Sequence, residues 1–159
     1  MSSRSCFLLW LALVSGCGTR VATVSGTVNY RGEKVPSGTI TFISGSTLCQ
    51  AEIQNGRYEV ESVPPGEAVI TVVRLDPDQP DPYEALNKVR KQMLEKNVAD
   101  PKQIDPHVVT DPVQLEAMWQ KRHLLPFSYS SPGTTDLRFT VTPGVNTFHI
   151  DLHDHPPSK

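Results

Sequence analysis

The chain has little cysteine, no long apolar run and no excess of positive charge. Only three of its 159 residues are cysteines, and the apolar run at residues 6–14 is far shorter than the roughly 20 residues that a membrane-spanning helix needs. Lys and Arg number 15 against 17 Asp and Glu, which gives a formal net charge of −2. Without a basic excess there is no electrostatic attraction for nucleic acid, so we expect no nucleic-acid partner.

The N-terminal segment has the pattern of a secretory signal peptide. One positive side chain, Arg4, precedes the apolar residues 6–14, and two small residues follow that run. The sequence Val14-Ser15-Gly16-Cys17 then resembles the lipobox of bacterial lipoproteins, in which an aliphatic residue and two small residues precede a cysteine that receives diacylglycerol. The alternative is an ordinary secretory signal followed by an incidental cysteine.

The lipobox resemblance implies that residues 1–16 are a signal peptide cleaved between Gly16 and Cys17, and that residues 17–22 are a lipidated tether. Several acyl chains, palmitate among them, would hold the mature chain on a membrane, because each buried CH₂ contributes about 0.8 kcal/mol. We therefore expect a membrane partner and a location in the cell envelope. Gly18 stands where an inner-membrane retention signal would carry aspartate, which favours the outer membrane, on its periplasmic or surface face, in a host with two membranes.

The remaining chain is long enough for one domain. Removal of 16 residues from 159 leaves 143, a length that buries about 70% of the unfolded-chain surface in one core. Cys49 is then the last free cysteine, which excludes an intramolecular disulfide. No Lys or Arg is near it in the sequence to lower its pKa, so we interpret it as a buried inert thiol rather than a nucleophile.

Residues 21–75 show alternation of period two, broken by turn residues, which predicts short β-strands. Asn55-Gly56 favours the positive φ angles of a type I′ turn, so we expect a hairpin there. Residues 68–73 are almost continuously apolar and predict a central strand. The expected strands cover residues 23–30, 39–43, 49–53, 58–60 and 68–73.

Residues 76–126 differ in character and predict a two-helix insertion. This stretch holds seven of the fourteen prolines, five of them after an aspartate. Asp81-Pro82 and Asp111-Pro112 each provide an N-cap followed by proline at the first helical position. We expect one helix through Lys96 and a shorter one ending near His123, both lying across the sheet or shielding one of its edges.

The strand pattern returns near the C-terminus. Residues 137–141 and 147–152 alternate in the same way and are separated by a Pro-Gly turn, so we expect a second hairpin that closes the domain. About seven short strands with this punctuation favour a mainly β fold, an antiparallel β-sandwich over residues 23–152, followed by a polar tail at 153–159.

Four segments in order resemble a known family. They read Val24-Ser25-Gly26-Thr27-Val28, Val35-Pro36-Ser37-Gly38-Thr39-Ile40-Thr41-Phe42, Asn55-Gly56-Arg57-Tyr58-Glu59-Val60 and Val63-Pro64-Pro65-Gly66. Together they resemble the carboxypeptidase regulatory-like (transthyretin-like, prealbumin-like) domain, as carried by short lipoproteins of planctomycete type. The resemblance covers residues 21–75, and the closing strands look like those of the same lipoproteins.

This resemblance implies a non-catalytic accessory fold without a cofactor, used for folding support, adhesion or contacts with carbohydrate and protein. The transthyretin-like hydroxyisourate hydrolases are an enzymatic alternative, and they end in Tyr-Arg-Gly-Ser. Here Tyr30-Arg31-Gly32 lies in an early turn followed by Glu33. We therefore expect no enzymatic activity of that kind.

His149, Asp151 and His153 are candidate metal ligands. Their alternation places all three on one face of the last strand, and imidazole and carboxylate groups hold zinc or copper when they converge. The competing interpretation, which we prefer, is that polar side chains at the end of a strand simply face water.

Three functional hypotheses follow. The first is an envelope-anchored binding or structural module, whose sheet edges or inserted helices contact an envelope protein or polysaccharide. The second is a lipoprotein that binds a small ligand or a metal through the C-terminal His and Asp residues. A catalytic hydrolase ranks third.

Overall fold

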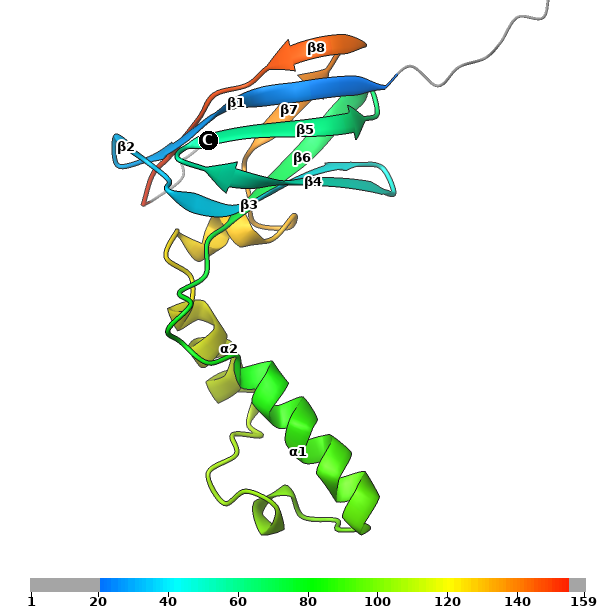
Figure 1. Ribbon diagram of the computed structural model, residues 1–159, viewed down its shortest axis with the longest axis vertical. Coiled ribbons are helices and arrows are strands. Elements are labelled where there is room, and N and C mark those ends of the chain that lie inside the picture. Colours follow the sequence, from blue (N-terminus) through cyan, green and yellow to red (C-terminus); the bar gives the residue numbers. More distant parts are fainter. Residues whose placement is uncertain (1–20, 155–159) are drawn as a thin grey trace, which may run out of the picture.

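The computed structural model describes residues 21–154, and this part of the chain is mainly β-structure with two α-helices (Figure 1). The mainly β prediction is confirmed. The strands are β1 (Ala22–Tyr30), β2 (Glu33–Lys34), β3 (Ser37–Ser44), β4 (Thr47–Gln54), β5 (Arg57–Val63), β6 (Gly66–Val73), β7 (Arg138–Val141), β8 (Gly144–Thr147) and β9 (Ile150–Leu152).

The strands form one curled sheet in the order β2-β1-β5-β4-β3-β6-β7, and β8 and β9 both pair with β1. Strands β4 and β5 share the single ladder pair Gln54↔Arg57, and farther along the Cys49 thiol of β4 contacts the Ser62 carbonyl of β5. Only Thr142 and Pro143 lie between β7, which pairs with β6, and β8, which pairs with β1. The sheet therefore bends over on itself, and its concave side encloses the core (Figure 1).

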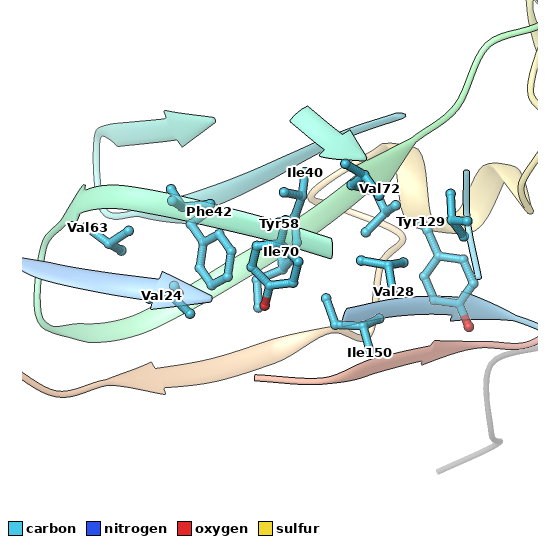
Figure 2. Close-up of a cluster of buried hydrophobic side chains, with 14 of the residues drawn as sticks. Val24, Val28, Ile40, Phe42, Tyr58, Val63, Ile70, Val72, Tyr129 and Ile150 are labelled. Atoms are coloured by element: carbon cyan, nitrogen blue, oxygen red, sulfur yellow. The ribbon is translucent and has the colours of Figure 1, made fainter. Parts of the chain in front are cut away.

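The core is formed mainly by inward-facing side chains of the strands, and Val35, Leu125 and Tyr129 join it from outside the strands. Val24, Val28, Ile40 and Phe42 are fully buried, as the alternation of β1 and β3 predicted. Figure 2 shows them gathered with Ile70, Val72 and Tyr58 on the inner side of the curled sheet. Burial of each large aliphatic or aromatic side chain contributes about 1.5–3 kcal/mol, so this cluster is the main source of stability.

The hairpin at Asn55-Gly56 is confirmed. Both residues have positive φ, 51° and 75°, as a type I′ turn requires, and the flanking residues Gln54 and Arg57 pair across it. A second two-residue turn, Gly45-Ser46, joins β3 to β4, whose pairing runs without interruption from Ser44↔Thr47 to Ser37↔Gln54.

The predicted hairpin of residues 137–141 with 147–152 is wrong. Strand β7 pairs with β6, whereas β8 and β9 pair with β1 and run parallel to it, so the sheet is not purely antiparallel. Buried Asn146 stabilises the connection between β7 and β8. Its side chain accepts a hydrogen bond from the backbone N–H of Thr142 at 2.9 Å and donates one to the Thr142 carbonyl at 2.7 Å. Alternation identifies a strand and its buried face, but it carries no information about the partner.

Both predicted helices are present, as α1 (Pro82–Lys96) and α2 (Pro112–Lys121). The side chain of Asp81 accepts from the backbone N–H groups of Tyr83 and Glu84, and Asp111 caps α2 in the same way. Their expected position is wrong, because the helices pack on one another and project from the sheet as an arm (Figure 1). Of the predicted apolar stripes, only Val89 in α1 and Leu115 in α2 are buried, whereas Met118 is exposed.

The arm joins the sheet through a narrow neck. Leu75 and His123 form an isolated antiparallel bridge, flanked by hydrogen bonds from Asp76 N to Arg122 O at 2.7 Å and from Leu124 N to Arg74 O at 2.9 Å. The Arg122 guanidinium lies 3.0 Å from the Asp81 carboxylate, so one side chain holds the start of α1 to the end of α2. The arm therefore has a fixed attachment rather than a free linker.

Aromatic side chains along the neck also hold the arm to the sheet. Trp119 lies edge-on to Tyr83 and His123, with ring centroids 5.9 and 5.3 Å apart, and His123 in turn lies 4.9 Å from Phe127. Such pairs add about 0.5–1.5 kcal/mol each beyond their burial. The column of rings stiffens the arm where it meets the sheet.

Gly26 is required by a close approach of two strands. A Cβ at this position would lie 1.8 Å from the carbonyl oxygen of Phe148 and 3.2 Å from the ring of Tyr58. Phe148 hydrogen-bonds through its N–H to the Ser25 carbonyl at 2.9 Å, which holds the two backbones at this distance. Any side chain at position 26 therefore forces residues 144–152 away from β1.

We predict that Gly26→Ala lowers the free energy of unfolding by more than about 2 kcal/mol, because the backbone of Phe148 has no room to retreat. The matched control is Gly133→Ala, where the added Cβ meets nothing closer than 4.0 Å and φ is not positive. Urea unfolding of both variants measures the difference. Equal stability of the two would contradict the close packing of β1 on residues 144–152.

Candidate functional site

A groove of about 870 Å³ lies on the outer face of the sheet. It runs over β1, β5, the end of β4 and residues 147–149. On β5 the alternation is plain, because Tyr58 and Val60 are buried whereas Arg57 and Glu59 are exposed. The side chains that line the groove with charge or hydrogen-bonding groups include Thr27, Glu52, Gln54, Arg57, Glu59 and His149.

His149 is the most chemically versatile group in this groove. The parallel register of β8 and β9 on β1 places it beside Thr27, and its Nδ1 lies 3.0 Å from the Thr27 hydroxyl. Together with Arg57 and the two carboxylates Glu52 and Glu59, the groove offers both donors and acceptors. Such a lining suits a polar ligand, for example a saccharide or an extended peptide.

The three candidate metal ligands lie along one exposed face, each opposite a residue of β1 or beyond its end. Asp151 accepts a hydrogen bond from the Asn29 side chain at 2.9 Å, next to the contact of His149 with Thr27. The backbone N–H of His153 donates to the Tyr129 hydroxyl at 3.3 Å. Within residues 21–154, no three His, Cys, Asp or Glu side chains are grouped to hold a metal ion.

An ion pair holds the end of the described chain to the turn after β1. Arg31 donates to both carboxylate oxygens of Asp154, at 2.9 Å through its NH2 group, and the Tyr30 hydroxyl donates to the same carboxylate. The hydrogen bond to Asp154 raises the pKa of both Tyr30 and Arg31. The Tyr-Arg-Gly sequence at residues 30–32 thus serves a turn that is tied to the C-terminal segment.

Tyr58 is the one strongly perturbed acid in the described part of the chain, and it lies beneath the groove. Burial raises the pKa of its phenol well above the ordinary value of 10.0, because the ionised form is penalised in an apolar environment. Its hydroxyl donates to the Phe148 carbonyl at 2.7 Å, at the same contact that requires Gly26. The Tyr58 hydroxyl therefore stabilises the packing of β1 on residues 144–152 rather than offering a hydrogen-bonding group to a ligand.

Cys49 is free, and it is half-buried rather than fully buried as expected. Its thiol lies 3.5 Å from the Ser62 carbonyl, and the side chain packs against the core. The predicted lipidation site Cys17 and its neighbour Gly16 lie outside the described residues, as do the signal peptide and residues 155–159 of the tail. No helix in residues 21–154 is long and apolar enough to cross a membrane.

The arm presents a second surface, on the inserted helices that the first functional hypothesis named as contact elements. Leu94 of α1 and Val113 of α2 are 80% and 76% exposed, although both belong to apolar types that are usually buried. A small hollow of about 240 Å³ is lined by Leu94 itself together with Arg90, Met93 and Val98 among others. One feature of the sequence indicates the aromatic contacts of the neck: Trp119, His123 and Phe127 are spaced four residues apart.

We predict that the stability of the protein falls as pH rises above about 10 and that Tyr58→Phe reduces this fall. The unfolded chain releases the Tyr58 proton near pH 10.0, whereas the folded chain retains it to higher pH, so deprotonation favours unfolding. Urea unfolding at pH 8 and pH 11 measures the effect, with Tyr83→Phe as the control at an exposed tyrosine. The same alkaline loss in both variants would contradict this role.

Comparison of the chain with protein-family models, with curated proteins and with solved structures found no match.

Proposed function

We propose that the protein is a lipid-anchored lipoprotein of the cell envelope whose β-domain is a non-catalytic binding module. The observation that carries the proposal is the order of residues at the N-terminus, in which Arg4, an apolar run and Val14-Ser15-Gly16-Cys17 precede the β-domain directly. Strand β1 begins at Ala22, so five residues (17–21) of the tether predicted at residues 17–22 precede the first strand. The domain would therefore lie close to the membrane surface, in the outer membrane where the host has two.

The binding role is favoured by the two surfaces described above. The groove is open and lined by hydrogen-bonding side chains, which suits an envelope polysaccharide or peptide, and the arm exposes apolar side chains at a distance from the sheet. The His149, Asp151 and His153 side chains do not converge, so a metal site remains the less favoured alternative.

We also propose that the curled sheet is a two-layer sandwich of the transthyretin-like kind. One layer would contain β8/β9, β1, β2 and β5, and the other β4, β3, β6 and β7. The single shared pair of β4 and β5 supports this division, and so does the contact of Phe42 with Tyr58 across the core, with ring centroids 6.0 Å apart. An experimental structure with continuous pairing of β4 and β5 beyond Gln54↔Arg57 would contradict it.

The lipid anchor is tested by labelling cells with a palmitate analogue. We expect the wild-type chain to incorporate label and to enter the detergent phase of a Triton X-114 extraction, since the thioether forms at Cys17. Cys17→Ser should lose both properties, whereas the matched control Cys49→Ser should keep both. Labelling that survives in Cys17→Ser, or an unmodified mature mass, would overturn the proposal.

The arm is tested by site-specific photo-crosslinking in intact cells. A photoreactive residue in place of Leu94 should give adducts of defined mass, because this side chain is exposed at the end of a projecting element. The control is the same replacement at Val145, which is 84% exposed but lies on the sheet. Identical adducts at both positions would show that the arm is not a specific contact surface.

A further inference from the structure

The far end of the arm has the opposite charge to the rest of the described chain. We define the arm end as residues 88–110, which comprise the second half of α1, the short helix η1 (Pro101–Gln103) and the connection to α2 (Figure 1). It contains five Lys or Arg and three Asp or Glu, whereas the rest of residues 21–154 contains seven and fourteen. A basic arm end therefore projects from an acidic sheet and neck.

The cations of the arm end are not neutralised by the protein itself. The ion pairs formed within residues 21–154 are Arg31–Asp154 and Arg122–Asp81, and neither involves the arm end. Its five cations are all exposed; they are Lys88, Arg90, Lys91, Lys96 and Lys102. Their charge therefore faces solvent, where an anionic partner can reach it.

The end of α1 forms one wall of the small apolar hollow described above. Asn97 has a positive φ of 52°, and the N–H groups of Asn97 and Val98 both donate to the Met93 carbonyl, at 3.0 Å for Val98. In this common helix cap the second residue past the helix packs on the last turn, which explains why Met93 and Val98 are apolar. Capping does not explain Leu94, which lines the same hollow and is 80% exposed.

Two of the cations lie beside Leu94. Side chains three and four residues apart share one face of a helix, which places Arg90 and Lys91 one turn before Leu94. Arg90 also lines the hollow. The surface thus combines a single apolar contact with two adjacent positive charges.

The size and lining of the hollow favour a peptide side chain as the occupant. Pockets for cofactors and small ligands are roughly 300–1,000 Å³, so a hollow of about 240 Å³ suits something smaller, such as one aliphatic or aromatic side chain. Met93 supplies an adaptable wall. A membrane surface instead requires a broad apolar helix face, and Leu94 is the one large apolar side chain exposed in residues 88–110.

We propose that the arm end binds an acidic peptide segment of another protein. One apolar side chain of that segment packs on Leu94 and Met93 in the hollow, and flanking Asp or Glu side chains lie beside Arg90 and Lys91. The acidic remainder of the domain repels the same segment, so the charge distribution directs it to the arm end. This inference deepens the proposed binding role of the arm and rests on it, but it does not depend on the lipid anchor or on the groove.

The test is selection from a random peptide library displayed on phage, with the full-length protein in non-ionic detergent as the target. We expect the enriched peptides to carry Asp or Glu next to Leu, Ile, Met or Phe. One enriched peptide, synthesised with its carboxylates replaced by amides, should bind at least about tenfold more weakly than the acidic form in fluorescence anisotropy. The absence of enrichment, or enriched peptides whose affinity does not depend on carboxylates, would overturn the proposal.

A matched pair of charge reversals locates the peptide site. Lys91→Glu and Lys121→Glu both replace an exposed lysine of an arm helix and change the net charge equally, but only Lys91 lies beside Leu94. We expect Lys91→Glu to weaken peptide binding at least about tenfold and Lys121→Glu to change it less than about twofold. Circular dichroism and thermal unfolding check that both variants are folded. An equal loss in the two would indicate general charge attraction and contradict a site at the arm end.

Leu94→Ala tests the apolar contact, and it also decides the matter if Lys91→Glu does not fold. Leu94 is exposed and alanine is the best helix former, so the helix is retained. Loss of the buried side-chain contact should weaken peptide binding at least about fivefold. The control is Val113→Ala on α2, which is 76% exposed and should bind as the wild type. Wild-type affinity in Leu94→Ala would overturn the proposal.

The adducts formed by a photoreactive residue at position 94 in intact cells separate the other occupants. A lipid adduct, or an adduct between two copies of this chain, would assign the arm end to a membrane or to self-association and overturn the inference. An adduct with another protein whose cross-linked peptide lacks acidic residues would overturn this inference alone and leave the proposed binding role of the arm in place. Identical adducts at positions 94 and 145 would contradict that role itself.

Discussion

The parallel pairing of β1 with residues 144–152 is the constraint on which the rest of the fold depends. It brings the beginning and the end of the described chain together and leaves β1 paired on both sides, with β5 and with β8 and β9. The approach is close because Gly26 has no side chain, and the Tyr58 hydroxyl bonds the Phe148 carbonyl at the same point. Without this contact, β1 would become an open edge and the core would lose its cover of Ile150 and Leu152.

The same pairing creates the groove on the outer face. Side chains that point away from the core on β1 and on residues 147–151 meet in register, so Thr27 contacts His149 and Asn29 contacts Asp151 although 122 residues separate each pair. Because successive side chains of a strand point to opposite faces of the sheet, the polar side chains form a row on the outer face and the apolar ones form the core on the inner face. The surface proposed for ligand contacts is thus a consequence of how the domain closes.

The insertion at residues 76–126 has a different relation to the fold. It leaves the sheet after β6 and returns before β7, and the bridge of Leu75 with His123 closes its base. The helices bury little against the sheet, so their stability depends on capping by Asp81 and Asp111, on the Arg122–Asp81 contact and on the aromatic column. An element that contributes so little to the core yet is held so firmly at its base fits a role in contacts with another molecule.

Local chemistry allowed the sequence alone to determine the strands β1 and β3 to β6, the type I′ turn at Asn55-Gly56, both helix starts and the inner faces of β1 and β3, whereas β2 was expected to be part of a turn. These features depend on near neighbours, on period-two burial and on the φ preferences of single residues. The partners of β7, β8 and β9, the projecting arm, and the contact between Thr27 and His149 were decided only by tertiary structure. Alternation specifies which face of a strand is buried, but the strand beside it is chosen by which distant segments can close one core together.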